Sequence, residues 1–189
     1  MSSVISNYAL PAPQESPGLW TLAWRRLLND RVGMVCLAIV AAYLAMMLAS
    51  YAGLPDARLI EPGVTGSWSV KDIIAHVTVW EEEALAHLPV VLAGRRPPRY
   101  SVAHGGITAF NAKMTERNRS LTLAEVLRRR DATHRRLVGL VGGAPETECA
   151  GDTRFRRRLR LDTYGHYAVH TRAITRWRDI LRKRCCCRR

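Results

Sequence analysis

The feature that most constrains the fold is a run of 23 residues without a charged side chain, from Val32 to Leu54. As a helix rising about 1.5 Å per residue, such a run is long enough to cross a hydrocarbon core of roughly 30 Å. A helix that is apolar on all sides is also typical of the buried helix of a soluble bundle. Two alternatives therefore stand for residues 32–54: a membrane span and a buried helix.

Charged residues flank this run unevenly. Arg25, Arg26 and Arg31 precede it, and only Arg58 follows closely. Because positive charge marks the cytoplasmic side of a span, the first alternative predicts a single-pass protein of the inner or plasma membrane with a cytoplasmic N-terminus. The second alternative predicts a cytoplasmic protein. In both, the polar, proline-containing residues 1–17 are expected to form a flexible leader.

Positive charge is concentrated in the last third of the chain. There are 29 Lys and Arg against 16 Asp and Glu, and residues 128–189 alone hold 18 basic and 6 acidic side chains. Such a surface could contact nucleic acid, anionic lipid or an acidic substrate. No helix-turn-helix or zinc-finger motif accompanies it, so we expect nonspecific rather than specific nucleic-acid binding. Residues 182–189 are predicted to form a basic, cysteine-rich tail.

Beyond the apolar run, the sequence has the pattern of amphipathic helices, and no long stretch alternates with the period of a strand. Capping boxes at Ser69 and Thr122 mark two helix starts. The expected helices cover residues 69–92, 107–118, 122–142 and from about 160 onward. The arginines of residues 154–160 are expected in a loop or at a weakened helix start, with Leu161 and Tyr167 pointing inward. The predicted class is all-α: a four-helix bundle preceded by the apolar helix.

Two of the six histidines stand four residues apart near the end of the chain. His166 and His170 would share one face of the last helix, with Cβ atoms about 5–6 Å apart. His76 lies within an earlier helix among apolar neighbours, where an imidazole without a partner would be costly. Three imidazoles leave coordination positions for water or substrate, which is typical of a catalytic rather than a structural metal site.

The segments around these histidines resemble the DinB-like superfamily of four-helix-bundle metalloproteins. They are G-S-W-S-V-K-D-I-I-A-H, which ends at His76, and D-T-Y-G-H-Y-A-V-H, which ends at His170. The resemblance covers about residues 54–177 and implies a DinB-like bundle over residues 55–181. It implies that His76, His166 and His170 hold one divalent metal ion, most often zinc or nickel. Relatives with an assigned activity include thiol-dependent transferases, which implies a low-molecular-weight thiol among the small-molecule substrates.

The N-terminal part carries a second resemblance. Residues 16–31, S-P-G-L-W-T-L-A-W-R-R-L-L-N-D-R, continue into the apolar run and together, to about residue 53, resemble the start of an oligopeptide ABC-transporter permease. The run occupies the place where a DinB-like bundle has its first helix. In a compact structure we expect part of residues 32–50 to lie against the helix carrying His76 or the helix carrying His166, because a bundle without its first helix would expose apolar surface.

Glu83 is the candidate catalytic residue. It lies two helical turns beyond His76 and could accept a hydrogen bond from a metal-bound water or a ligand imidazole, whereas Glu81 to Glu83 together are more typical of a solvated acidic face. The leading hypothesis is a divalent-metal-binding protein that acts as a metal-dependent hydrolase or a thiol-dependent transferase. The alternatives are a membrane-anchored non-enzymatic protein or permease-fragment fusion, and nonspecific nucleic-acid binding; a homo-oligomer is compatible with each.

Overall fold

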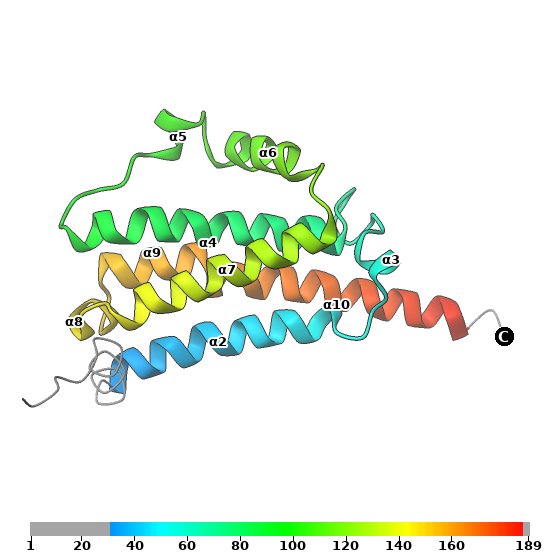
Figure 1. Cartoon of the computed structure of the whole chain (residues 1–189), viewed down its shortest axis with the longest axis horizontal. Helices are drawn as coiled ribbons and strands as arrows, with labels where there is room; N and C mark the ends of the chain where they lie inside the picture. Colours follow the sequence, from blue (N-terminus) through cyan, green and yellow to red (C-terminus); the bar gives the residue numbers. More distant parts are fainter. Residues whose placement is uncertain (1–30, 187–189) are drawn as a thin grey trace, which may run out of the picture.

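The computed structural model describes residues 31–186, and every regular element in this part of the chain is a helix. The helices are α2 (Arg31–Tyr51), α3 (Asp56–Leu59), α4 (Val70–Leu92), α5 (Tyr100–Ala103), α6 (Ile107–Asn118), α7 (Leu123–Gly142), α8 (Glu146–Cys149), α9 (Arg154–Asp162) and α10 (Tyr164–Cys186) (Figure 1). The predicted all-α class is confirmed. The predicted leader, residues 1–17, lies outside the described residues, and residues 182–186 of the predicted tail continue α10.

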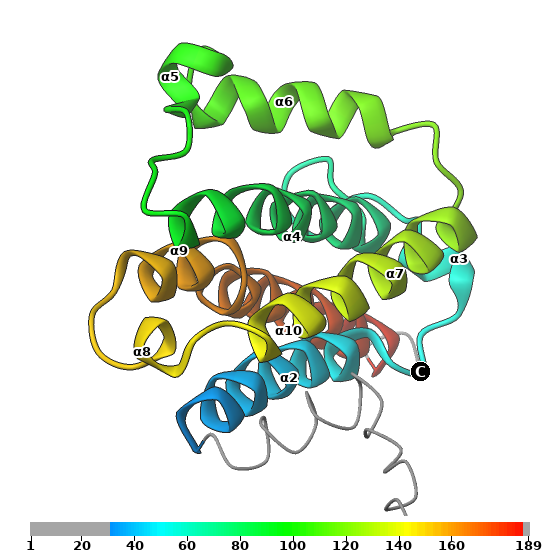
Figure 2. The ribbon, with the colours of Figure 1, turned by 60° about the vertical axis from the view of Figure 1, so that its left-hand side comes forward.

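Four long helical arms lie side by side and form the bundle: α2, α4, α7 and the consecutive pair α9–α10 (Figure 2). Helix α4 contacts α7, α9 and α10, and α2 contacts α10 and α7. Helix α6 packs on the outer side of α4. The bundle thus encloses α4 on several sides, which makes this helix the centre of the fold.

Helix α4 begins where its sequence predicts. The Ser69 hydroxyl accepts a hydrogen bond from the Asp72 backbone N–H (3.2 Å), and the Asp72 carboxylate accepts one from the Ser69 N–H (2.9 Å). This capping box satisfies two N–H groups that the helix itself leaves without partners. Ile73 and Ile74 are fully buried because α4 is covered by neighbouring helices. The sequence around His76 is therefore held in the interior of the bundle.

Helix α2 is one of the bundle helices, and one of its sides faces the core. Met47 is fully buried in the core, and Tyr51 accepts a hydrogen bond at its hydroxyl from Arg130 of α7 (2.6 Å). The main contact of α2 is with α10, the helix that carries His166. The expectation that residues 32–50 lie against one of the histidine helices is confirmed.

The membrane span expected as one alternative for residues 32–54 is not supported. Among the residues that the structure describes fully, which leave out several at the start of α2, no helix is both long and apolar enough to cross a membrane. The side chains of α2 are also sorted as in a bundle helix, since Met47 is 0% exposed and its neighbour Met46 is 49% exposed. Helix α2 is the first long helix of the bundle that the structure describes.

The basic segment before the predicted last helix differs from expectation. Residues 154–162 form α9, whose first turn is capped by the Thr153 hydroxyl accepting from the Arg156 N–H (3.0 Å). The prediction of a loop was wrong because Phe155 and Leu159, four residues apart, form a fully buried apolar stripe that holds the helix on the bundle. Leu161, which was expected to point inward, is 56% exposed.

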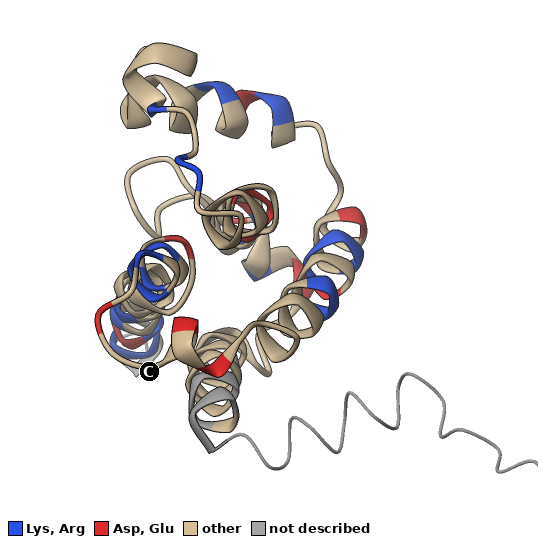
Figure 3. Ribbon diagram, turned by 90° about the vertical axis from the view of Figure 1, so that its left-hand side faces the viewer, with Lys and Arg blue, Asp and Glu red and all other residues tan. Residues whose placement is uncertain are grey.

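Charge follows this arrangement. Viewed along the bundle, Lys and Arg residues lie on α7 and on the α9–α10 arm, with few acidic residues among them (Figure 3). The apolar stripes of these same helices face the interior of the bundle and contribute Leu137 and Ile174 to the core. The basic residues in the last third of the chain thus lie on the outer faces of two helical arms, and they do not form a separate domain.

Candidate metal centre

Three histidines meet between α4 and α10. Their ring centroids are 5.0 Å apart for His76 and His166, 5.1 Å for His76 and His170, and 4.9 Å for His166 and His170. One ring nitrogen from each lies within 4.8 Å of the others, and Nε2 of His76 is 2.9 Å from Nε2 of His166. The fold thus brings together the three residues that the sequence predicts as ligands, from two helices far apart in the chain.

The junction between α9 and α10 sets the position of His166. Thr163 has non-helical backbone angles (φ −129°, ψ −104°) and ends α9, and α10 starts at the next residue. Gly165 allows the two helices to meet closely, because a Cβ at this position would lie 2.7 Å from the backbone oxygen of Arg160. The four-residue spacing then places His170 on the same face of α10, one turn further along.

Aromatic rings and burial make this an apolar site. The ring centroid of Trp68 is 4.9 Å from that of His76, and the centroid of Trp80 is 5.4 Å from that of His166. Burial, and secondly the neighbouring imidazoles, lower the pKa of His76 to about 3 and that of His170 to about 4. Burial also lowers the pKa of His166. All three rings are therefore neutral at neutral pH, the form in which imidazole binds metal.

The histidine cluster borders a hollow on the surface. This histidine hollow has a volume of about 440 Å³ and is lined by His166 and His170 together with Arg157, Arg160, Leu161, Gly165 and Val169. His76 lies deeper, at 7% exposure. A molecule in the hollow would meet the two α10 imidazoles, while His76 holds the inner side of the cluster.

Glu83, the predicted catalytic residue, lies in a neighbouring polar group. Its carboxylate accepts a hydrogen bond from the Tyr100 hydroxyl (2.5 Å) and lies 3.7 Å from Nδ1 of His87. Arg158 donates to the same Tyr100 oxygen (3.0 Å). The ring of Trp80 connects this group to the cluster, since its centroid is 5.5 Å from that of Tyr100. Glu83 therefore positions Tyr100 in this structure, and its predicted role toward a metal-bound water stays a prediction.

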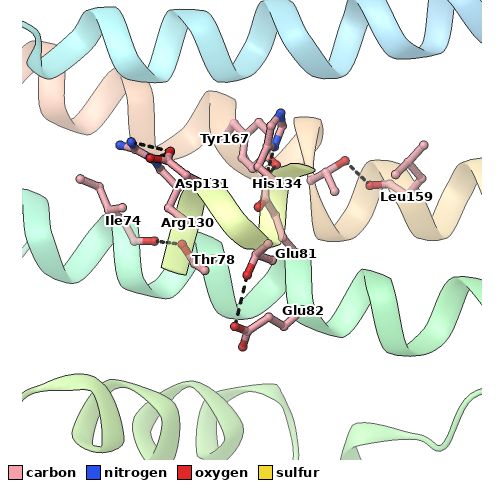
Figure 4. Close-up of polar contacts among 11 residues, drawn as sticks. Ile74, Thr78, Glu81, Glu82, Arg130, Asp131, His134, Leu159 and Tyr167 are labelled. Carbon is pink, nitrogen blue, oxygen red and sulfur yellow. Dashed lines mark hydrogen bonds and ion pairs between the residues drawn. The ribbon is translucent and has the colours of Figure 1, made fainter. Parts of the chain in front are cut away.

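A buried polar network that the sequence analysis missed fixes the other side of α10. The Glu81 carboxylate accepts from the Tyr167 hydroxyl and lies 2.9 Å from Nδ1 of His134, so that it joins α4, α7 and α10 (Figure 4). Burial, and secondly Glu81, raise the pKa of Tyr167 well above its usual value. Since Tyr167 follows His166 directly, this network holds the rotation of α10 that presents the histidines.

The interpretation of Glu81 as part of a solvated acidic face was wrong, because the side chain is 1% exposed. A signal was present in the sequence. Glu81 occupies one position of the helical stripe Ile74, Val77, Ala84 and Leu88, each spaced by three, four or seven residues from it. These four residues are buried, and Glu81 is buried with them.

The fold and the cluster define the class of protein. It is an all-α bundle in which two helices carry three histidines whose ring nitrogens lie close enough together to hold one metal ion. The sequence matches the model of the DinB superfamily over residues 40–173. The chain belongs to the DinB superfamily, which is often metal-binding. A solved structure described as sibling lethal factor precursor DfsB superposes with a TM-score of 0.63 and 14% identity, over 79% of this chain and 96% of that chain. This likeness concerns the fold.

The comparisons also correct the second resemblance. The family match begins at residue 40, inside the apolar run, so the later half of the run belongs to the DinB domain and not to a preceding segment. The permease resemblance of residues 16–53 is not supported, and residues 16–30 lie outside the described part of the chain. A comparison with curated proteins gave no match.

Proposed function

We propose that this protein binds one divalent metal ion through His76, His166 and His170 and uses it as a metal-dependent enzyme, a hydrolase or a thiol-dependent transferase. The observation that carries the proposal is the convergence of three imidazole nitrogens within 4.8 Å of one another. Membership of the DinB superfamily supports it independently.

The residues present fit a metal ion. Burial keeps the imidazoles neutral, with a nitrogen lone pair free to bind a cation. The cluster offers three nitrogen ligands, which leaves at least one position of a tetrahedral ion for water or substrate. Imidazole is a good ligand for zinc, nickel, copper and iron, and zinc or nickel is the proposed ion.

When bound, the metal would lower the pKa of a coordinated water or thiol and so supply a nucleophile at neutral pH. The residues of this chain would bind and orient the reactants. The rings of Trp68 and Trp80 limit the access of bulk water to the cluster, and the hollow beside His166 and His170 gives a small-molecule substrate its approach. Glu83 is the proposed acceptor of a hydrogen bond from a metal-bound water; in this structure its carboxylate accepts the hydroxyl proton of Tyr100, so Tyr100 has no proton left to donate to a substrate.

Metal analysis of the purified full-length chain tests the assignment. After incubation with zinc or nickel and removal of excess, wild type should retain about one ion per chain. His76→Ala and His170→Ala should each weaken binding at least about tenfold, because two imidazoles hold a divalent ion less tightly than three.

His104→Ala is the matched control, because His104 is exposed and lies outside the cluster. It should bind metal like wild type. Circular dichroism of each variant shows that the bundle is folded. Equal binding by wild type and both cluster variants, or no metal in folded wild type, would contradict the proposal.

A further inference from the structure

A second hollow adjoins the histidine hollow and is rich in arginine. It has a volume of about 660 Å³, within the range of small-molecule sites. Six arginines line it: Arg95, Arg96, Arg99, Arg154, Arg157 and Arg158. No acidic side chain is among the described residues that line it. We refer to it as the arginine hollow.

Most of this positive charge has no counterpart in the described part of the chain. Arg157 pairs with Asp152 (2.9 Å) and Arg158 with Asp162 (2.5 Å). The other four arginines form no ion pair within residues 31–186. Four guanidinium groups around one concave surface repel one another, and an anion placed among them would relieve this repulsion.

The arginines come from two segments that the fold brings together. Arg95, Arg96 and Arg99 lie in the connection between α4 and α5, and the others lie on α9. Arg154 donates a hydrogen bond to the backbone oxygen of Gly94 (3.2 Å), which ties the two segments. Guanidinium groups from two segments suit an oxyanion with several acceptor oxygens, such as phosphate or carboxylate.

Apolar side chains also line the arginine hollow. Val91, Pro97, Pro98, Ile107 and Leu161 contribute to the lining, and Ile107 and Leu161 are 50% and 56% exposed. Half-exposed apolar side chains beside unpaired arginines favour a ligand with an apolar segment next to its anionic group. An inorganic anion alone would leave these side chains in water.

The two hollows meet at shared residues. Arg157 and Leu161 line both the arginine hollow and the histidine hollow, since α9 lies between them. A molecule in the arginine hollow can therefore extend along α9 toward His166 and His170.

We infer that the arginine hollow binds the phosphate or carboxylate group of a small amphiphilic molecule whose other end reaches the histidine cluster. Anion binding follows from the arginines alone. The statement that the bound molecule is the substrate rests on the proposed function of the metal centre.

Titration calorimetry on the full-length, metal-free protein tests the anion site with hexyl phosphate, hexanoate and 1-hexanol, which share one apolar chain. At least one of the two anions should bind with a Kd at least about tenfold lower than that of the alcohol. The tighter anion identifies the group that the hollow prefers.

The test variant is the triple substitution Arg95→Gln, Arg96→Gln and Arg99→Gln. These exposed side chains form no ion pair within the described residues, so the fold should persist. The matched control replaces three exposed arginines elsewhere by Gln: Arg117, Arg135 and Arg136. Both variants lose the same net charge. The first should raise the Kd of the anion at least about tenfold and the control by less than about twofold. Equal effects of the two triples, or equal binding of the alcohol, would overturn the inference.

A second measurement addresses the substrate assignment. With cobalt in the metal site, 6-mercaptohexyl phosphate should produce a thiolate-to-cobalt absorption band at a concentration at least about tenfold lower than hexanethiol. The triple variant at residues 95–99 should lose this advantage. If the two thiols act at equal concentration in wild type, the link between the hollows is wrong. Failure of cobalt to bind concerns the proposed function only, because the calorimetry uses metal-free protein.

Discussion

Replacing Met47 by Ala tests whether the apolar run works as a bundle helix. The Met47 side chain is 0% exposed and belongs to the core formed by α2, α4, α7 and α10. Truncation removes three groups beyond Cβ, each contributing about 0.8 kcal/mol of burial, and leaves a cavity that adds to the cost. The expected loss in the free energy of unfolding is about 3 kcal/mol. For a chain of this size the melting temperature should fall by roughly 6–12 °C.

Met46→Ala is the control at the neighbouring position, since this side chain is 49% exposed. Its expected loss is about 1 kcal/mol or less. Both variants are compared with wild type by urea unfolding of the metal-free protein, followed by far-UV circular dichroism, because bound metal would stabilise the native state. Equal, small losses at both positions would refute the packing of α2 in the core, as both methionines would then lie in similar surroundings.

Two further predictions concern buried polar groups. Tyr167→Phe removes the hydroxyl that donates to buried Glu81 and should lower the free energy of unfolding by about 1–3 kcal/mol; Tyr164→Phe, half-buried, is the control, and equal urea midpoints for the two variants would contradict the prediction. Burial raises the pKa of Asp162 from 3.8 to about 7 despite its ion pair with Arg158, so the folded protein holds a proton that the unfolded chain releases and stability falls as pH rises from about 4 to 7. Asp162→Asn should lack this contribution of up to about 4 kcal/mol, and parallel pH profiles of unfolding for wild type and variant would show the assignment wrong.

Much of the local structure could be predicted from sequence because its causes are local. The capping boxes at Ser69 and Thr122 form as their S-x-x-D and T-x-x-E patterns predict, and they set the starts of α4 and α7. The four-residue spacing of His166 and His170 determines that they share a helix face. Each of these features depends on atoms within one helical turn, so no knowledge of the tertiary structure is needed to derive them.

Other features depend on how the helices pack against one another. The sequence permits both a span and a bundle helix for residues 32–54, and contact of Met47 with the core selects the bundle. Glu81 is buried because His134 and Tyr167, distant in sequence, satisfy one of its carboxylate oxygens.

The arginine hollow shows the same dependence. The composition places +12 of the net charge in residues 128–189, yet three of the arginines of the hollow, in residues 95–99, come from outside that region. Periodicity indicates which side of a helix is apolar, but not which other segment it will face. The arginines lie together, and the three imidazoles meet, because apolar contacts hold α9 against α4 and hold α10 against α2 and α4.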